Sequence, residues 1–407
     1  MIVLSGAELV LPDRILSPGT LVLDAGRIVE VRADAPPAGG HPHPPFAFHD
    51  HYIVPGFIDV HVHGVDGFDS LDGLGAIRSI AAKLPRYGVT AFCPTTVACA
   101  PEALRTVLDQ VREAREAPHA RSARVLPAHL ESNFINPEFR GAQPLECLRS
   151  PRSALDATVR RAASDPSGQF DAADILREIE RAAPDVGIVT IAPELDGGLD
   201  LVRWLSTRGH PVSLGHSNAT YEQALAAIAA GARQATHLFN RMPPLHHRAP
   251  GLAGAVLQTD EVAAEVICDG FHVHPALVRT AIAAKRPSRV LAITDGTAAA
   301  GLSPGSRARI GGRSITVSDS TALLDDGTIA GSLWTMDRVF QTLVGRVGVS
   351  LVDAVALCST TPARELGLLG HGLLAEDAVA DLVVLDPQFN VVQTYVEGQL
   401  VYARAHS

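Results

Sequence analysis

Lysine is nearly absent from this sequence. Of the 34 basic residues in the chain of 407, only Lys83 and Lys285 are lysines, and all the others are arginines. The 44 acidic residues outnumber the basic ones and give a net charge of −10. Because nucleic-acid grooves and anionic-membrane surfaces require clustered positive charge, we expect neither kind of partner.

The sequence also lacks paired cysteines and long apolar runs. Its five cysteines are scattered without a C-x-x-C pair, which excludes a disulfide framework and a thiolate zinc cluster and fits a reducing compartment. Glu8 and Asp13 interrupt the N-terminal segment too early for a signal peptide. No uncharged apolar run reaches the length of about 18 residues that a membrane span needs. We therefore expect a cytoplasmic protein.

The apolar residues that are present suffice for a large core. They make up 46% of the chain, against 19% charged residues, which excludes disorder. Residues 1–32 and the closing segment ADLVVLDPQFNVVQTYVEGQLVYAR both combine short apolar runs with turn residues, the pattern of antiparallel strands. This similarity predicts a small β-sandwich domain built from both termini. Its N-terminal part would span 1–54, and its C-terminal helix and strands would span 356–407.

The long middle of the chain, residues 55–355, alternates short apolar runs with helical segments. Eight such runs can be followed, from GFIDVHVH to VLAITDG, and this alternation is typical of a (β/α)8 TIM-like barrel. A doubly wound open sheet is the competing α/β fold, but no G-x-G-x-x-G motif follows any of the runs. We therefore predict a barrel over these residues.

Histidines and carboxylates gather where the predicted strands end. Barrel enzymes carry their reactive groups at the C-terminal ends of the strands. Read in chain order, those ends supply the following set: His61, His63, His129, Glu131, Glu194, His216, His237, Asp269, His272 and Asp295. This concentration of ligand-type side chains predicts a metal site.

Three H-x-H pairs could begin that site. Alternate residues of a strand point to the same face, so such a pair chelates an ion only where it continues a strand. His41/His43 is flanked by prolines, and His49/His51 precedes the strand, so both pairs fit a loop. Only His61/His63 follows an apolar run, GFIDV, which favours this pair as the metal-binding one.

The shortage of lysine bears on how two ions could be bridged. One common bridge in dinuclear sites is a lysine carboxylated at a strand end. Lys83 and Lys285 both lie in predicted helices, away from the strand ends. A bridge, if there is one, must then be a native carboxylate, and Glu131 at the end of VLPAHLE is the best placed. Whether one or two ions bind per subunit stays open.

Three further residues complete the predicted centre. His216 and His237 end consecutive strands and contribute to a nitrogen and oxygen ligand set that suits Zn²⁺, with Fe²⁺, Co²⁺ and Mn²⁺ as alternatives. Asp295 ends the last strand of the barrel. A carboxylate there can take a proton from a metal-bound water and pass it to a leaving amine.

Several longer motifs extend this pattern along nearly the whole chain. They include PGFIDVHVHG, SLGHSNAT, THLFNRMPPLHHRAPGLAGA, ICDGFHVHP and ITDG. With them the sequence resembles the amidohydrolase superfamily and, within it, the N-acetylglucosamine-6-phosphate deacetylase family. The THLFN-M block followed by R-PG, with DG-HV downstream, is specific to that deacetylase family. The resemblance implies that Glu131, His216 and His237 bind the principal ion, and that His61 and His63 bind a second ion bridged by Glu131.

The resemblance also implies roles around the substrate. Asp295 matches the catalytic acid and base, and His272 matches a histidine that contacts the substrate and polarises its acetamide carbonyl. Asn240 lines the phosphate pocket in this comparison. Arg248 matches an arginine that reaches the sugar phosphate from the neighbouring subunit of a homodimer, and a guanidinium suits a phosphate well.

The implied reaction is the hydrolysis of N-acetylglucosamine 6-phosphate, a step of amino-sugar metabolism that yields glucosamine 6-phosphate and acetate. Ser132-Asn133 stands where the family has Gly-Pro, and a different turn beside Glu131 is expected to bear on which sugar epimer or acyl group is accepted. The alternatives are a deacetylase of the galactosamine epimer, another amidohydrolase such as an N-acyl-amino-acid deacylase or a cyclic-amide hydrolase, and a non-catalytic barrel.

Overall fold

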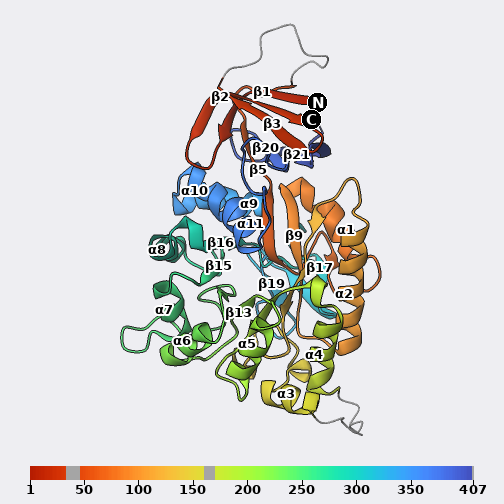
Figure 1. Ribbon diagram of the computed structural model, residues 1–407, viewed down its shortest axis with the longest axis vertical. Helices are drawn as coiled ribbons and strands as arrows, with labels where there is room; N and C mark the ends of the chain where they lie inside the picture. The colour runs from red at the N-terminus through yellow and green to blue at the C-terminus, as the bar shows by residue number, and fades with distance from the viewer. Residues whose placement is uncertain (34–45, 160–169, 406–407) are drawn as a thin grey trace.

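A barrel and a small β-domain make up the molecule, and they are stacked along its long axis (Figure 1). The computed structural model describes residues 1–33, 46–159 and 170–405. The His41/His43 pair considered above lies outside these residues. Within them, no helix is both long and apolar enough to cross a membrane.

The small domain joins the two ends of the chain in one sheet with the strand order β22-β21-β20-β5-β1-β2-β3. Strand β5 is the link, because it pairs in parallel with β1 and antiparallel with β20. Leu4, Leu21, Ile53 and Leu382 meet in the core of this domain. The predicted small β-domain built from both termini is thus confirmed. Its strands are β1 (Ile2–Val10), β2 (Ile15–Asp24), β3 (Arg27–Arg32), β4 (Phe46–Ala47), β5 (Tyr52–Pro55), β20 (Leu382–Leu385), β21 (Val391–Val396) and β22 (Gln399–Ala403).

Eight parallel strands form the barrel, as the alternating pattern predicted. They are β6 (Phe57–Val62), β9 (Val89–Thr96), β11 (Ala128–Glu131), β12 (Val186–Ile191), β13 (Val212–Leu214), β14 (Gln234–Ala235), β15 (Ala263–Ile267) and β16 (Val290–Ile293). The short strand β10 (Arg124–Val125) pairs with β9 at its edge. The barrel closes between its last and first strands, where the Asp295 N–H donates to the His61 carbonyl at 3.0 Å.

The chain passes from the small sheet into the barrel at Gly56, between β5 and β6. A Cβ atom on Gly56 would lie 2.1 Å from Oγ1 of Thr90, so a larger residue there would have to displace the Thr90 side chain. The Gly56 N–H donates to the Asp381 carbonyl at 2.9 Å. The apolar run around Gly56 therefore supplies strand β5 of the small sheet and strand β6 of the barrel.

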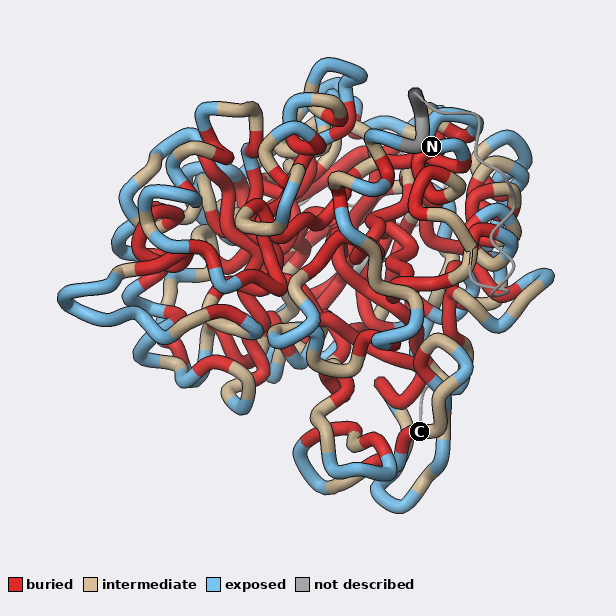
Figure 2. Tube along the Cα trace, turned by 90° about the horizontal axis from the view of Figure 1, so that it is seen from below, coloured by how far each residue is buried: buried red, intermediate tan, exposed pale blue. Residues whose placement is uncertain are grey.

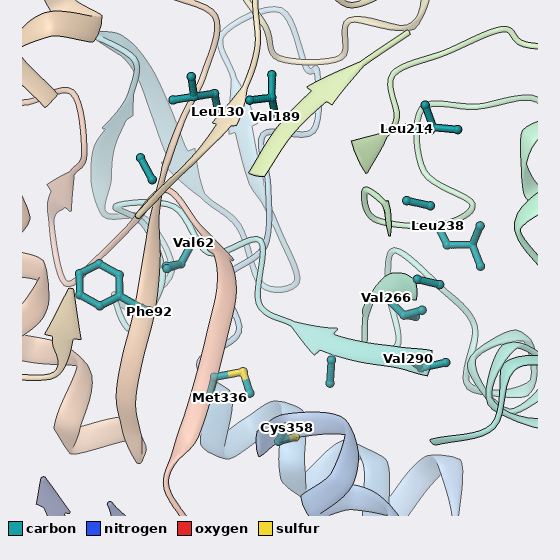
Figure 3. Close-up of a cluster of buried hydrophobic side chains, with 14 of the residues drawn as sticks. Val62, Phe92, Leu130, Val189, Leu214, Leu238, Val266, Val290, Met336 and Cys358 are labelled. Carbon is teal, nitrogen blue, oxygen red and sulfur yellow. The ribbon is translucent and has the colours of Figure 1, made fainter. Parts of the chain in front are cut away.

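Alternate side chains of the barrel strands enter two different cores. Val266 and Val290 belong to the large cluster against the surrounding helices (Figure 3), whereas Ile267 and Leu291 belong to the cluster inside the barrel. The trace coloured by burial shows buried residues in the middle of the molecule and exposed residues in the outer loops (Figure 2). The strands that carry the reactive residues are thus packed on both faces.

The helices around the barrel begin and end at recognisable signals. Asp171 and Thr220 form capping boxes with Asp174 and Gln223, and these fix the starts of α4 and α6. The helices are α1 (Ala76–Lys83), α2 (Pro101–Glu116), α3 (Pro151–Val159), α4 (Ala172–Arg181), α5 (Gly198–Ser206), α6 (Tyr221–Ala229), α7 (Gly251–Gln258), α8 (Pro275–Lys285), α9 (Met336–Thr342), α10 (Leu351–Val355) and α11 (Thr361–Glu365). Shorter 3₁₀ turns are η1 (Leu84–Tyr87), η2 (Pro137–Phe139), η3 (Leu145–Cys147), η4 (Ala183–Asp185) and η5 (Pro287–Arg289), and η6 (Leu343–Val347) and η7 (Ala356–Thr360) are π-helical.

Two small antiparallel sheets were not predicted. One is the hairpin of β7 (Gly64–Val65) and β8 (Phe68–Asp69). The other is a three-stranded sheet that follows the last barrel strand, formed by β17 (Arg307–Ile310), β18 (Arg313–Val317) and β19 (Ala322–Leu324). Ile310, at the end of β17, reaches the cavity at the barrel mouth. This sheet therefore contributes to the wall of the candidate site.

Candidate metal centre

The predicted metal-site residues come together at the C-terminal mouth of the barrel. Three of them follow their strands by two residues and share an unusual backbone, with φ values of 48° at His216, 31° at His237 and 48° at Asp295. Non-glycine residues rarely adopt this left-handed region, and where they do, the surrounding structure holds them there, often at a functional site. The same turn is used at three strand ends to aim a side chain into the mouth.

Glu131, His216 and His237 form one cluster. Oε1 of Glu131 lies 2.8 Å from Nε2 of His216 and 2.9 Å from Nε2 of His237, and the two Nε2 atoms are 3.0 Å apart. All three side chains are buried. Three potential ligand atoms from three different strands thus converge on one point.

His61, His63 and Asp295 form a second cluster beside the first. Nε2 of His61 and Nε2 of His63 are 3.3 Å apart, and each lies 3.3 Å from Oδ1 of Asp295. Glu131 lies between the clusters, because its two oxygens are 3.8 Å from His61 and 3.6 Å from His63. Glu131 is therefore placed where a bridging carboxylate would be.

These residues fit a divalent cation. The Nε2 atoms of His216 and His237, which both face Oε1 of Glu131, cannot both donate a hydrogen bond to each other. As neutral imidazoles, however, both can direct their lone pairs at one metal ion. Nδ1 of His63 and Nδ1 of His237 are buried and have no hydrogen-bond partner. A donor set of imidazoles and carboxylates suits zinc and similar borderline ions.

The ligand orientations are set by neighbouring groups. Nδ1 of His61 lies 2.9 Å from Oε2 of Glu265, and Nδ1 of His216 lies 2.7 Å from the Phe139 carbonyl. With the Nδ1 proton donated to these acceptors, each Nε2 keeps its lone pair for the mouth. Gln143 donates to Oε2 of Glu131 and accepts from the Ala98 N–H. Gln143 therefore holds the Glu131 carboxylate by Oε2, while Oε1 faces His216 and His237.

The charges of the two clusters shift each other's pKa values. Burial by itself raises the pKa of Glu131 and that of Asp295, but the neighbouring imidazoles outweigh it and lower the pKa of Glu131 well below its usual value and that of Asp295 to about 2. Burial alone would lower the pKa of His237, yet the hydrogen bond that it donates to Glu131, together with the charge of that carboxylate, raises it to about 9. In His61 burial dominates and lowers the pKa to about 4. Both carboxylates are thus kept ionised.

A cavity of about 480 Å³ opens over the two clusters. His272 lines it, and Nδ1 of His272 lies 2.6 Å from Oδ2 of Asp269. Asn240 lines it as well, and its side-chain amide donates to the His237 carbonyl at 3.2 Å. Arg248 is exposed and does not line the cavity of its own chain.

Several residues singled out in the sequence do not face the cavity. Oγ of Ser132 lies 2.5 Å from the Thr190 carbonyl, and Nδ2 of Asn133 donates to the carbonyls of Cys99 and Cys147 at 2.8 and 2.7 Å. These two side chains fasten the turn after β11, so any effect of Ser132-Asn133 on specificity would act through the shape of that turn, and this role stays a prediction. The pair His49/His51 lies in the turn before β5, away from the barrel mouth.

Two other strand-end residues and both lysines also have structural environments. Glu194 accepts from Asn136 and Ser217, and His129 lies between the Val60 carbonyl and Thr190. Lys83 ends α1, and the buried Nζ of Lys285 donates to the carbonyl of Thr259. Neither lysine is near the clusters, as the sequence predicted.

Sequence reasoning missed Gln143 and Arg241, which both line the cavity. Gln143 belongs to an irregular loop that no periodicity describes. Arg241 lies within the block THLFNRM, but nothing in that block distinguishes a side chain that faces the cavity from one that faces solvent. A parallel barrel with buried histidines and carboxylates at its mouth is typical of metal-dependent barrel enzymes.

Comparison with known proteins places the chain within that class. The model of the amidohydrolase family matches residues 52–401. The N-acetylglucosamine-6-phosphate deacetylase of Bacillus subtilis (strain 168) is 34% identical over 357 residues, which cover 87% of this chain and 85% of that protein. The enzyme of the same name from Homo sapiens is 35% identical over 418 residues, covering 98% and 94%.

Solved structures agree with the sequence comparison. The N-acetyl-D-glucosamine-6-phosphate deacetylase of Mycobacterium smegmatis, determined as a mutant in complex with N-acetyl-D-glucosamine-6-phosphate, has a TM-score of 0.85 and 33% identity, and the match covers 98% of this chain and 99% of that chain. The deacetylase of Pasteurella multocida has a TM-score of 0.86 and 26% identity, with 99% and 100% covered. The chain belongs to the amidohydrolase family and, within it, to the N-acetylglucosamine-6-phosphate deacetylases.

Proposed function

We propose that this protein hydrolyses N-acetylglucosamine 6-phosphate to glucosamine 6-phosphate and acetate. The observation that carries the proposal is the convergence of Glu131, His216 and His237 beside Asp295, at the base of a cavity of about 480 Å³. A cavity of this size accommodates a small ligand such as a sugar phosphate. Family membership supports the substrate class.

Glu131, His216 and His237 would hold the principal divalent ion, and His61 and His63 would hold a second ion with Glu131 between them. Zn²⁺ is the ion that we propose first, and Fe²⁺, Co²⁺ and Mn²⁺ suit the same ligands. When bound, the ion polarises the amide carbonyl and lowers the pKa of water in the site.

Asp295 would move the proton that the reaction needs. Its carboxylate is ionised and faces the site, so it can accept a proton from the attacking water as the oxygen bonds to the carbonyl carbon. The same proton then passes to the sugar nitrogen as the C–N bond breaks. One water is consumed, and acetate and the free amine leave.

His272 would stabilise the negative charge that develops on the carbonyl oxygen. Asp269 holds its Nδ1 at 2.6 Å, and this contact fixes the ring at the cavity wall. In its protonated form, the imidazole can donate from Nε2 to the substrate. A single donor aimed at an oxyanion contributes about 3 kcal/mol in comparable enzymes.

The substrate phosphate would be bound in part by a second copy of the chain. Arg248 is exposed and outside its own cavity, which supports a homodimer in which it reaches the neighbouring site. Leu245, in the same loop, is 48% exposed, which suits an interface.

The five free cysteines are as expected of a reducing compartment and support a cytoplasmic location.

Steady-state acetate release tests the proposal. N-acetylglucosamine 6-phosphate, its galactosamine epimer and unphosphorylated N-acetylglucosamine would be compared with the metal-loaded protein. We expect the first substrate to have the highest kcat/KM, and treatment with a chelator to abolish activity that Zn²⁺ then restores. Equal rates on phosphorylated and unphosphorylated sugars, or turnover of N-acyl amino acids alone, would contradict the assignment.

A further inference from the structure

One arginine faces the cavity from the same chain. Among the residues that line it, Arg241 is the only one with a permanently cationic side chain. The cavity also contains Glu131, His216 and Asp295, so a small molecule bound at the metal centre is within the same enclosure as this guanidinium. Arg248 is not part of that wall.

The guanidinium of Arg241 is uncommitted. In the described part of the chain, it has no hydrogen bond and no carboxylate within ion-pair distance. Several other arginines are paired with carboxylates, such as Arg105 with Glu178 at 2.5 Å and Arg181 with Asp109 at 2.8 Å. An arginine side chain at a cavity wall that has no carboxylate partner has its full set of N–H donors available to a ligand.

The backbone of Arg241 is fixed relative to the metal centre. Arg241 has a φ of 50° and follows Phe239, whose φ is 77°, in a tight turn that begins at His237. The Ser217 N–H donates to the Arg241 carbonyl at 3.1 Å, and the Asn240 N–H donates to the His237 carbonyl at 2.9 Å. The cation is thus tied to a predicted metal ligand four residues earlier.

The neighbouring loop leaves space for this side chain. Gly141 has a φ of +60°, and a Cβ atom there would lie 2.6 Å from Nε of Arg241 and 3.2 Å from its Cζ. Glycine therefore meets two requirements at this position, a left-handed backbone and an open side towards the guanidinium. Gln143, two residues on, donates to Glu131, so the same loop contacts both the cation and the metal centre.

We propose that Arg241 is a specificity-determining residue that binds the phosphate group of the substrate from within the same subunit. The planar fork of its guanidinium matches two phosphate oxygens. The proposal rests on the proposed function, which supplies the phosphate. The anion would then meet one arginine from each chain, Arg241 and Arg248 of the partner subunit, in a protein whose net charge of −10 otherwise repels it.

Substrate kinetics of Arg241→Ala and Arg241→Lys test this role. For N-acetylglucosamine 6-phosphate, we expect Arg241→Ala to raise KM about tenfold or more with little change in kcat, since a charge-assisted contact made equally in the ground and transition states is lost. Arg241→Lys should fall between, because it keeps the charge without the fork. The kcat/KM for unphosphorylated N-acetylglucosamine should not change in either variant.

Arg140→Ala is the matched control. Arg140 is an exposed arginine next to Gly141 that donates to the Pro137 carbonyl and does not line the cavity, so its removal should leave both substrates unaffected. An unchanged KM for the phosphorylated sugar in Arg241→Ala would overturn the inference. An equal loss on both sugars would do the same, because it would indicate a structural role.

A binding measurement separates this inference from the proposed function. Calorimetric titration of glucosamine 6-phosphate into wild-type protein and Arg241→Ala should show about tenfold weaker binding in the variant. If the wild type turns over no phosphorylated N-acetyl sugar, the proposed function fails, and this titration still decides the role of Arg241. Equal affinities for the two proteins would rule that role out.

Discussion

At the scale of single residues, the site depends on side chains aimed by strained turns at strand ends. His216, His237 and Asp295 share the left-handed backbone described above, although only Asp295 is proposed to move a proton. Their positions follow from buried strands that the surrounding core holds in place. Because these residues are proposed to have different roles, variants of the ligands His216 and His237 should lose metal, whereas a variant of Asp295 should lose activity and keep its metal.

Replacement of the proposed proton carrier is the first test at this scale. Asp295→Asn keeps the shape of the side chain but removes the proton acceptor, so we expect kcat to fall by about 10²–10⁴-fold. Metal content by mass spectrometry should stay as in the wild type, whereas His237→Ala should lose metal. Retention of most activity in Asp295→Asn would mean that another group carries the proton.

Asn133 offers a test of structure against specificity. Its buried amide donates to two carbonyls, so Asn133→Ala should lower the free energy of unfolding by about 1–3 kcal/mol while KM for the sugar phosphate changes little. Urea unfolding and steady-state kinetics check the two parts. Asn218→Ala, at an exposed asparagine, should change stability by less than about 0.5 kcal/mol. A change of preferred sugar epimer in Asn133→Ala would instead support the specificity role inferred from the sequence.

At the scale of elements, the barrel strands could be predicted because burial on both faces makes each one a continuous apolar run. The metal-site residues could be proposed because each follows such a run and because a known family shares the motifs. Strands β17 and β18 could not, since exposed and buried residues alternate in short segments such as RARI and RSITV. The positions of Gln143 and Arg241 at the cavity wall could not be predicted either, because both residues lie in irregular loops whose course no sequence periodicity describes.

One carboxylate joins the small β-domain to the barrel and makes that junction sensitive to acid. Burial would raise the pKa of Asp381, but hydrogen bonds from His371 and the Glu397 N–H, together with the charge of Arg124, lower it below its ordinary value of 3.8. A carboxyl with a lowered folded pKa stabilises the fold above its unfolded pKa. That contribution is lost as the pH falls through the lower folded value.

Asp381→Asn should therefore destabilise the protein at neutral pH, by about 2 kcal/mol. The difference from wild type should begin to shrink below about pH 4, where Asp381 of the unfolded chain becomes protonated, and should be lost once the pH falls through the lower folded pKa. Urea unfolding at several pH values measures this. Asp13→Asn, in the exposed pair with Arg14, should cost less than about 1 kcal/mol at every pH. A difference for Asp381→Asn that stays constant down to low pH would contradict the assigned pKa shift.

At the scale of the whole molecule, the proposed homodimer predicts complementation between two defective chains. In a mixed dimer of Arg248→Ala and Asp295→Asn subunits, one site would keep its own Asp295 and receive Arg248 of the partner subunit. After subunit exchange at limiting substrate, activity should rise towards about a quarter of the wild-type value, since half the dimers are mixed and each has one intact site. Activity no greater than the sum of the parents would place Arg248 outside the neighbouring site.

Because the chain has only two lysines, few of its groups can react with amine-coupling reagents. Lys285 is buried on its carbonyl partner, so Lys83 and the amino group of Met1 are the accessible amines. Lys83 ends α1 just before η1, which touches the small domain through Thr394 and Pro85, and Met1 lies beside β1 in that same domain. Coupling through amines would therefore attach the protein to a sensor surface by the end remote from the barrel mouth, with the cavity over the metal centre facing the solution.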